Sequence, residues 1–470
     1  MSVSLHSDSP ELIVVGAGFS GTLTVVNLLR HAPKTGLRLS LIERRSRQGR
    51  GLAYHTWDDN LLLNVPAGNM SALPDVPGHF VDYLRNIDPA FNAGSFVSRR
   101  IYGDYLENTL AQAQSTSTAA LQRISGEVRA VRADARTPGG YVVELADGRR
   151  LHADQVVLAL GHFPPRNPPP ESDFFASEAY VADPWNFEAI DRMDAGRPIA
   201  ILGAGHTAVD ALFRLTSHSD ARKVYLISRR GLLTHGHRFT PKAPTSGGGL
   251  PDYLNDLPST VFAHLRAIRR ETRRKLSAGD DWRDVINELR PYTQGIWQRL
   301  PVHERAKFLR RVAPYWDIHR HRFAPAAFLR LEQMRASGQV EVIAGQVLSY
   351  KQHGDETIVS IRQRRDGSLR ELTVGTVVNC TGPNYDIATL AIPLIVQLRE
   401  EGLIRQDPLK LGIEVNERYQ LLGSDGGAAR GLFYVGPMLK ARYWEAIAVP
   451  ELRAHAMRLA LQLVAPSVAG

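Results

Sequence analysis

Cysteine is almost absent from this sequence. The chain has 470 residues and a single cysteine, Cys380. One cysteine excludes an internal disulfide, a CxxC redox pair and any metal or iron–sulfur site that needs several thiolates. Cys380 lies in the apolar run TVVNCTG, where a small buried residue is the expected role. Thiol chemistry is therefore not expected.

Long apolar runs are also missing. No stretch of about 18 or more apolar residues occurs, so we expect no membrane-spanning helix. The first ten residues are polar and contain no apolar signal region, which favours a cytoplasmic location. With 43% apolar and 22% charged residues, the composition is that of a soluble globular chain of roughly two to three domains.

Several motifs that would mark an enzyme or binding class are absent. The sequence has no GxSxG, no HExxH and no P-loop. Two His-x-His pairs occur without an accompanying cluster of acidic residues, so we predict no metal site. These pairs are His235, His237, His319 and His321. The net charge of +9 fits either nucleic acid or small anions, but the densest basic stretch, 266–275, spreads its arginines around a helix with few aromatics. Nucleic-acid binding is therefore not expected.

A glycine-rich turn follows the first apolar run, 12–15, and an amphipathic helical pattern follows the turn. In such a strand–turn–helix unit, the first glycine permits the turn and the second lets a pyrophosphate approach the backbone. The third lets the helix pack on the strand. The helix N-terminus then offers unpaired N–H groups to the phosphates. The predicted contacts of this first dinucleotide site are Gly16, Gly18, Phe19, Ser20 and Gly21.

A second copy of this unit lies near the middle of the chain, in RPIAILGAGHTAVDALFRL. Ala208 replaces the third glycine, which is tolerated because that position only needs to be small. Two complete units in one chain predict two dinucleotide sites. The predicted contacts of the second site are Gly203, Gly205, His206, Thr207 and Ala208.

The strand after each turn ends in a different residue, Glu43 in the first unit and Ser228 in the second. A carboxylate accepts hydrogen bonds from both ribose hydroxyls and repels a 2′-phosphate, so the Glu43 unit fits the ADP part of FAD or NAD. Ser228 does not repel a phosphate, and Arg229 and Arg230 can bind one, so the second unit fits NADP(H). Arg44, which we also place at the first site, follows Glu43 in the same way. The arginines therefore do not distinguish the two sites, and the preference for NADP(H) rests on the absence of an acidic residue at Ser228.

The two halves keep matching beyond the turns. Segments 124–161 and 343–382 both open with Ile-x-Gly-x-Val, alternate like strands around an Asp-Gly turn, and close with an apolar strand followed by glycine. We therefore expect each unit to carry a β-meander and a final buried strand, and we place Gly161 and Gly382 at the two cofactors. The proline-rich HFPPRNPPP is predicted to link the two domains.

The remaining segments are predicted from their patterns. An insert at about 232–330, rich in Arg, Trp and Leu, is predicted to be helical. GLFYVGP is predicted as a buried strand ending at Gly436. YWEAIAVPELRAHAMRLALQL is predicted as a helix whose apolar face includes Ile447, Leu452, Met457 and Leu461.

This layout resembles the two-dinucleotide-binding-domain flavoproteins, which include glutathione reductase, class B flavin monooxygenases and N-hydroxylating monooxygenases. A closer resemblance is to the YdhS-like FAD/NAD(P)-binding proteins, and it rests on VVGAGFSG, GRGLAYHTWDDNLLLNVPAGNMSALPDVPGHFVDYL, ALGHFPPRNPPP and YWEAIAVPELRAHA. The resemblance implies an α/β fold of glutathione-reductase type with two Rossmann-like domains. Residues 1–163 and 384–470 would form the FAD domain, split by an NADP domain of 164–383 that carries the insert.

The resemblance also implies a chemistry. A disulfide reductase of this kind needs a cysteine pair beside the flavin, which a single Cys380 excludes. ALGHFPP resembles the linker of class B monooxygenases, which favours oxygen chemistry. In such enzymes NADPH reduces FAD, O2 adds at the flavin C4a atom, and bound NADP+ shields the peroxide. The protein contributes positioning and exclusion of water.

Individual site residues follow from the same resemblance. Arg50 would lie near the pyrophosphate and flavin, Asn64 would pass the flavin face and bond the flavin or NADP, and Val128 would offer its backbone to the adenine. The segment at Gly436 would close the FAD site, although Pro437 stands where the family usually has aspartate. For Arg50 and Asn64 the alternative is a purely structural loop or turn.

Catalytic candidates are Asn64, His162 and Trp444, with turn, cap or packing roles as the alternative for each. The insert would lie over the NADP domain and shape the substrate pocket. Its tryptophans would line that pocket or, as we favour, pack in a core. They are Trp282, Trp297 and Trp316.

The leading hypothesis is an FAD-dependent NADPH oxidoreductase, a monooxygenase that uses O2 on a small polar substrate such as an amine or amino acid. Two alternatives stay open. One is a flavin reductase that passes electrons to another acceptor, and the other is a non-enzymatic FAD-containing module whose basic helix binds a partner or nucleic acid. The sequence determines neither the substrate nor the oligomeric state.

Overall fold

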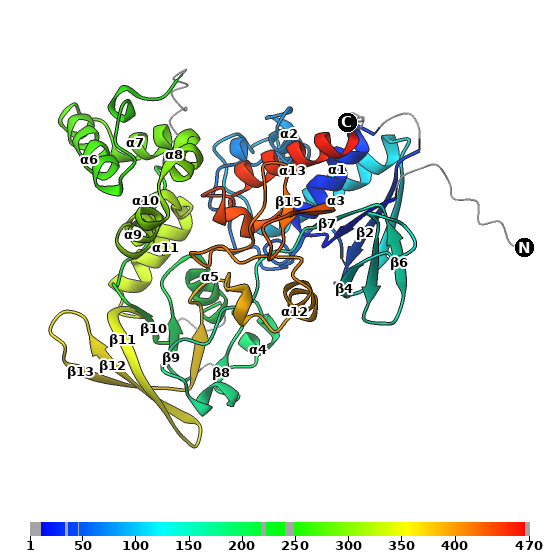
Figure 1. Ribbon diagram of the computed structural model, residues 1–470. Helices are drawn as coiled ribbons and strands as arrows, with labels where there is room; N and C mark the ends of the chain where they lie inside the picture. Colours follow the sequence, from blue (N-terminus) through cyan, green and yellow to red (C-terminus); the bar gives the residue numbers. More distant parts are fainter. Residues whose placement is uncertain are drawn as a thin grey trace, which may run out of the picture.

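The chain folds around two twisted sheets, each in its own lobe, with a helical lobe beside them (Figure 1). This computed structural model describes residues 11–32, 36–45, 47–194, 196–217, 222–239 and 249–465, so part of the predicted insert, 240–248, lies outside the described residues. None of the described helices is long and apolar enough to cross a membrane.

The first sheet has six strands in the order β15-β16-β7-β1-β2-β3. The five strands from β16 to β3 are parallel, whereas β15 pairs antiparallel with β16. Because β15 and β16 come from the C-terminal part of the chain, this sheet is completed by strands that follow the second sheet in the sequence. Its strands are β1 (Glu11–Val15), β2 (Arg38–Glu43), β3 (Ala120–Ser125), β7 (Gln155–Leu158), β15 (Gln420–Leu422) and β16 (Ala428–Tyr434).

Helices cover this sheet, and α1 lies between α3 and α13 (Figure 1). A meander of β4, β5 and β6 packs against α12 through β4. The helices are α1 (Phe19–Arg30), α2 (His79–Ile87), α3 (Arg99–Thr116), α12 (Pro393–Glu400) and α13 (Val449–Val464). The meander strands are β4 (Val128–Ala133), β5 (Tyr141–Leu145) and β6 (Arg150–Ala153).

The second sheet has seven strands in the order β13-β12-β11-β10-β9-β14-β8. The strands from β11 to β8 are parallel. The long β11 then continues into the antiparallel meander with β12 and β13, so parallel sheet and meander are joined here. The strands are β8 (Tyr180–Val181), β9 (Ile199–Leu202), β10 (Val224–Ser228), β11 (Val340–His353), β12 (Glu356–Gln363), β13 (Leu369–Val374) and β14 (Thr376–Asn379). Helices α4 (Phe187–Asp191) and α5 (His206–Leu215) accompany them.

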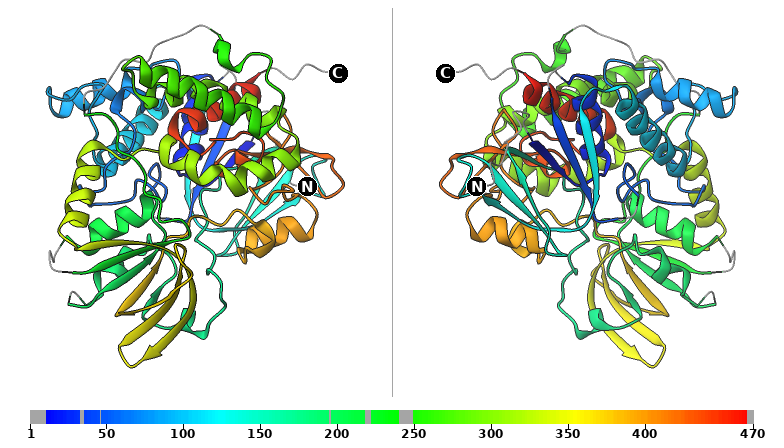
Figure 2. Two further views of the ribbon diagram at one scale, coloured as in Figure 1. Left: turned by 90° about the vertical axis from the view of Figure 1, so that its left-hand side faces the viewer. Right: turned by 90° about the vertical axis from the view of Figure 1, so that its right-hand side faces the viewer.

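The insert is helical, as predicted, and is fastened to the C-terminal segment of the first domain. The ring of Trp297 stacks on that of Trp444 with centroids 4.7 Å apart, and its Nε1 donates to the carbonyl of Ala441 at 3.1 Å. Trp316 Nε1 donates to Glu445 at 2.7 Å. Figure 2 shows these helices beside both sheets. They are α6 (Val261–Ser277), α7 (Trp282–Leu289), α8 (Thr293–Arg299), α9 (Val302–Arg311), α10 (Ala313–Arg320) and α11 (Pro325–Ala336).

The internal repeat extends to individual backbone atoms. The N–H of Gly16 donates to Ile42 and that of Gly203 donates to Ile227, both at 2.8 Å. A Cβ on Gly16 would lie 2.6 Å from the carbonyl oxygen of Ala159, and a Cβ on Gly203 would lie 2.2 Å from that of Cys380. Cys380 is therefore the counterpart of Ala159, a small buried residue packed against a glycine turn.

These observations confirm the predicted α/β class with two Rossmann-like units, of which the first takes strands from both ends of the chain. Both predicted Asp-Gly hairpins form, between β5 and β6 and between β12 and β13. The domain boundaries after residues 163 and 383 stay predictions.

The predicted C-terminal helix is wrong at its start. The helix begins at Val449 and not at Tyr443, because Glu445 adopts a left-handed φ of 73° and Pro450 fits only the first helical turn. The predicted apolar face is shifted as well, since Met457 is only half-buried and Leu461 is 39% exposed.

Alanine should destabilise the protein strongly at Gly203 and hardly at all at Gly205. Gly203 has φ +125° and meets Cys380 closely, so Gly203→Ala should lower the free energy of unfolding by on the order of 2–4 kcal/mol. Gly205 has extended backbone and open space at its Cβ position, so Gly205→Ala should change it by less than about 0.5 kcal/mol. Urea denaturation measures both, and equal losses would contradict this account of the turn.

Candidate active site

A cavity of about 2040 Å³ lies between the two sheets, the insert and the proline-rich linker. Single small-molecule pockets measure roughly 300–1,000 Å³, so this cavity has room for more than one ligand. Among the described residues, twelve arginines and Lys440 line it, against two carboxylates, Asp183 and Asp317. Its wall is therefore strongly cationic and favours anionic ligands.

The second glycine turn opens into this cavity. Gly203, Gly205, His206 and Thr207 line it, while Ala208 is fully buried behind them. Gly205 is the N-cap of α5 and has no side chain to pair the first N–H groups of the helix. A Cβ at Gly205 would meet nothing within 4 Å, so the backbone is open to a ligand. Uncapped N–H groups and an open approach are what a pyrophosphate requires.

The first glycine turn has the same local geometry as the second, but another loop of the chain packs against it. Gly18 is the uncapped N-cap of α1, and Phe19, Ser20 and Gly21 form its first turn. The backbone of Gly51 lies against Gly18, since a Cβ on Gly51 would be 2.8 Å from the Cα of Gly18. The loop after β2 thus covers the turn, and the helix N-terminus behind it retains the donors that a pyrophosphate needs.

The ends of β2 and β10 differ as the sequence predicts. The carboxylate of Glu43 is buried and accepts from the N–H groups of Ala17 at 2.8 Å and Arg45 at 3.0 Å, which aims it at the first turn. Ser228 Oγ accepts from the N–H of Gly231 at 3.1 Å and lines the cavity.

The arginines after the two strand ends occupy different places. Arg44, Arg45 and Arg229 all line the cavity. Arg230 is not part of the wall, and its Nη2 donates to the carbonyl of Arg310 at 3.2 Å. Of the two arginines predicted for a 2′-phosphate, only Arg229 is placed to reach one.

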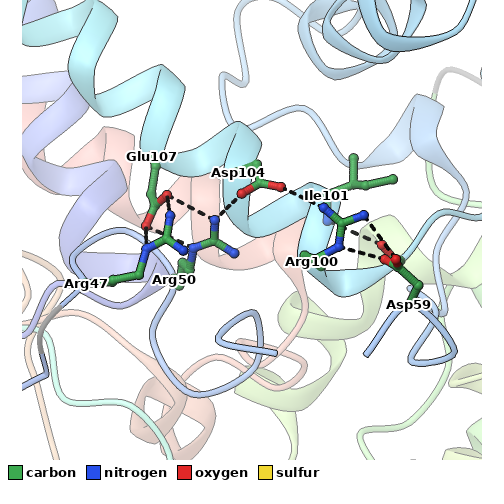
Figure 3. Close-up of polar contacts among 8 residues, drawn as sticks. Arg47, Arg50, Asp59, Arg100, Ile101, Asp104 and Glu107 are labelled. Carbon is green, nitrogen blue, oxygen red and sulfur yellow. Dashed lines mark hydrogen bonds and ion pairs between the residues drawn. The ribbon is translucent and has the colours of Figure 1, made fainter. Parts of the chain in front are cut away.

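Arg50 is held in a carboxylate clamp (Figure 3). Its side chain is 1% exposed, and its Nε and Nη2 donate to the two oxygens of Glu107 at 2.9 and 3.0 Å. Nη2 also bonds Asp104, and Arg47 binds the same Glu107 carboxylate at 2.6 Å. Although burial opposes its charge, Glu107 and Asp104 raise the pKa of Arg50. Its charge is already matched, so it acts here by anchoring the loop that covers the first turn.

Asn64 and Met70 lie in the loop that forms one wall of the cavity. The carbonyl of Asn64 accepts from His237 Nε2 at 3.0 Å, and that of Met70 accepts from the hydroxyl of Tyr102 at 2.9 Å. His237 belongs to the start of the insert, so this loop connects the first domain to the insert.

Two predicted histidines face the cavity. His162 Nδ1 lies 3.1 Å from the hydroxyl of Tyr385, and His206 Nε2 lies 2.8 Å from the carbonyl oxygen of His321. Although His162 is accessible from the cavity, removal from bulk water, followed by the charge of Lys440, lowers its pKa to about 4. Burial lowers the pKa of His206 to about 4 as well. Both imidazoles are therefore neutral at pH 7.

Trp444 is enclosed by packing. Besides Trp297, it contacts Phe308 edge-on with centroids 5.2 Å apart, and Lys440 Nζ lies 4.5 Å from its centroid. It is 4% exposed and is not part of the cavity wall. These contacts are those of a core residue, and a catalytic role stays a prediction.

The other predicted contacts are distributed over both domains. Gly382 lines the cavity with φ +101° and open space at its Cβ position, and Gly161 is exposed and equally open. Val128 begins β4 and is buried. Gly436 has φ +150°, and a Cβ there would lie 2.6 Å from the carbonyl oxygen of Leu160, so this tight turn requires glycine.

Several cavity residues were not predicted from the sequence. Val347 and Arg364 lie near the strand end at Ser228, because Ala344, the partner of Ser228 in β11, accepts from the N–H of Arg364 at 2.8 Å. The repeat contained the signal for Val347, which occupies the position of Val128 in the second Ile-x-Gly-x-Val. The sequence carries no comparable signal for Arg364.

Asp317 and Lys440 are two further residues of the cavity wall that the sequence did not reveal. Although Asp317 is exposed to the cavity, partial removal from bulk water raises its pKa to about 6, against the opposing charge of Lys440 and with a contribution from Glu445. Burial lowers the pKa of Lys440, against the attraction of both carboxylates. The cavity wall thus contains a carboxyl group that can take up or release a proton near neutral pH.

Comparisons with known proteins agree with this architecture. Residues 13–163 match the profile of a family described as FAD-NAD(P)-binding. An L-aspartate N-monooxygenase (nitrosuccinate-forming) of Streptomyces davaonensis is 26% identical over 270 residues, which is 46% of this chain. The match spans 41% of that relative's own length.

Solved structures match over nearly the whole chain. L-lysine 6-monooxygenase from Pseudomonas syringae has a TM-score of 0.66 at 16% identity, over 97% of this chain and 100% of that one. Ornithine N-hydroxylase of Kutzneria sp. 744, solved with reduced FAD, NADP+ and L-ornithine, has a TM-score of 0.63 at 16% identity, over 96% and 98%. At these identities the likeness concerns the fold, and it confirms the predicted resemblance to two-dinucleotide-binding-domain flavoproteins.

Histidines that the folded chain holds neutral predict sensitivity to acid. Burial lowers the pKa of His206 to about 4 and those of His237, His321 and His455 to about 3. Histidines of the unfolded chain titrate near 6.5. Between about pH 6.5 and 4 the unfolded chain therefore binds more protons, and the free energy of unfolding falls as the pH is lowered.

The variant His206→Gln isolates one of these groups. Glutamine keeps an N–H donor for the carbonyl of His321 but does not titrate. The slope of the free energy of unfolding against pH, measured by urea denaturation between pH 5 and 7, reports how many more protons the unfolded chain binds. In the variant this number should be smaller by up to about one proton. A slope identical to that of the wild type would show that His206 is not held neutral.

Proposed function

We propose that this chain is an FAD-dependent, NADPH-using monooxygenase that acts on a small amine or amino acid. The observation that carries the proposal is one cationic cavity that joins the second glycine turn, the loop after β2 and the loop at Asn64. The L-aspartate N-monooxygenase of similar sequence, and the L-lysine 6-monooxygenase and ornithine N-hydroxylase of similar fold, support it. A cytoplasmic location remains part of this proposal.

The chain offers suitable groups for both cofactors. For NADPH, the uncapped N-terminus of α5 would bind the pyrophosphate, and Arg229 would bind the 2′-phosphate beside Ser228. For FAD, the N-terminus of α1 and the carboxylate of Glu43 would bind the pyrophosphate and a ribose. Bound flavin, reduced by NADPH, would supply the electrons that activate O2.

The substrate amine needs a proton acceptor, because only the neutral amine is a nucleophile. Asp317 lines the cavity, and its pKa of about 6 leaves it mostly ionised at pH 7 yet able to take a proton. Asp317 would orient the ammonium group and accept its proton, while Lys440 would balance the carboxylate. The cavity wall would exclude water from the reacting atoms.

The proposal predicts that the purified protein is yellow and that it oxidises NADPH with consumption of O2. Hydroxylated product should appear with at least one of the test amines L-aspartate, L-lysine, L-ornithine and cadaverine, and mass spectrometry should show that its new oxygen comes from ¹⁸O2. An anaerobic reaction is the control. NADPH oxidation that needs an added electron acceptor and inserts no oxygen would indicate a flavin reductase, and protein that takes up no flavin would refute the proposal.

Coenzyme preference should depend on Arg229 and much less on Arg230. Arg229→Ala should raise the KM for NADPH about tenfold or more and change that for NADH little, because a charge-assisted bond to the 2′-phosphate is lost. Arg230→Ala is the matched control, since its guanidinium bonds the carbonyl of Arg310 outside the cavity. Equal losses with NADPH and NADH in Arg229→Ala would show that Arg229 does not recognise the phosphate.

A further inference from the structure

Arg322 is a buried arginine whose charge has no counter-ion among the described residues. It follows α10, lines the cavity and is 6% exposed. Its Nη2 donates to the amide oxygen of Asn287 at 2.5 Å, and its buried Nε has no hydrogen-bond partner among the residues that the structure describes. Burial of an unpaired charge costs free energy that a site for an anion would recover.

The groups around Arg322 do not supply that anion. Burial, followed by the like charges of Arg320, Arg283 and Arg238, lowers its pKa to about 10, so it stays charged at pH 7. Asp281 attracts it, but that carboxylate is already paired with Arg238 and Arg283.

A count of the charged groups around Arg322 also leaves its guanidinium without a carboxylate. The described residues of this cluster contain five guanidinium groups and four carboxylates, and the guanidinium without a carboxylate is that of Arg322. The paired arginines are Arg238, Arg283, Arg290 and Arg320, and their partners are Asp281, Asp284, Glu445 and Glu451.

We propose that Arg322 binds the carboxylate of the substrate and thereby restricts the cavity to small molecules that carry a carboxylate group. A guanidinium fork matches the two oxygens of a carboxylate, and Asn287 fixes its orientation. With Asp317 for the ammonium, the wall holds complementary groups for both charges of an amino acid. The identification of the anion as substrate rests on the proposed function, whereas the anion site itself does not.

The location of Arg322 favours a substrate carboxylate over a coenzyme phosphate. Asn287 lies on α7 of the insert, outside the dinucleotide-binding sheet. The backbone next to Arg322 pairs with His237, whose side chain contacts Asn64 in the first domain. Arg322 therefore faces the junction of insert and first domain, while the N-terminus of α5 and Arg229 remain for the phosphates of the coenzyme.

The test compares wild type and Arg322→Met by thermal unfolding with NADP+ and with three small-molecule probes, each added separately. These are succinate and L-aspartate, which carry carboxylates, and cadaverine, which carries none, each matched in ionic strength with chloride. Millimolar succinate and L-aspartate should raise the Tm of the wild type by a few degrees, about 2–5 °C, and cadaverine should not. Arg322→Met should lose the response to both carboxylates and keep the response to NADP+.

Two further variants keep the test decisive. Arg322→Lys retains the charge but not the fork, so it should fold and bind L-aspartate about tenfold more weakly by calorimetry. Arg222→Met is the control, because Arg222 is 5% exposed, donates to the carbonyls of Leu215 and Met193, and lies outside the cavity wall. It should keep the carboxylate response. Without ligand, Arg322→Met should unfold at a higher temperature than the wild type, since an unpaired buried charge is removed.

Three results would overturn the inference. They are a wild type that responds to neither carboxylate, an equal response in Arg322→Met, or loss of the NADP+ response in its place, which would assign Arg322 to a coenzyme phosphate. These readouts need no turnover. A protein that binds carboxylates through Arg322 but fails to oxidise NADPH would refute the proposed function and leave the anion site standing.

Discussion

The contact between each glycine turn and the strand beside it decides how the rest of the structure is arranged. At Gly16 and Gly203 the turn passes so close to the carbonyl of Ala159 or Cys380 that no side chain fits. The following helix therefore begins directly at the end of the strand, with its first N–H groups unpaired. Two uncapped helix N-termini are a product of this packing, and the single cysteine is a small residue that permits it.

Charge balance is the second constraint on the structure. The two domains are joined by ion pairs between Arg99 and Asp210, at 2.7 Å, and between Arg214 and Asp58, at 3.3 Å. The insert is joined to the C-terminal segment through Glu445. These contacts close the cavity on several sides but leave its wall rich in arginine. Much of the positive charge of the chain thus lies in the wall of the cavity, where anionic ligands are expected to bind.

Local sequence was sufficient for the parts of the site that depend on backbone conformation. The glycines of both turns, the exchange of Glu43 for Ser228, and the two Asp-Gly hairpins lie where their spacing indicated. The C-terminal helix was placed too early because apolar periodicity continues through Tyr443 to Ala448, where the left-handed Glu445 interrupts the helix. Periodicity cannot show such a break, since tertiary contacts of Glu445 with Trp316 and Arg320 hold it in place.

The sequence by itself determined that this protein has two Rossmann-like units. It also determined that the strand after the glycine turn ends in a carboxylate, Glu43, in the first unit and in a hydroxyl, Ser228, in the second. Both features lie within short, continuous segments of the chain. Only the tertiary structure decided which arginines form ion pairs with carboxylates and which do not. Arg50 is paired with Glu107, Arg230 bonds the carbonyl of Arg310 instead of lining the cavity, and Arg322 has no carboxylate partner among the residues that the structure describes. Side-chain charge is a property of the residue, but its counter-ion comes from a distant segment, and that pairing exists only after folding.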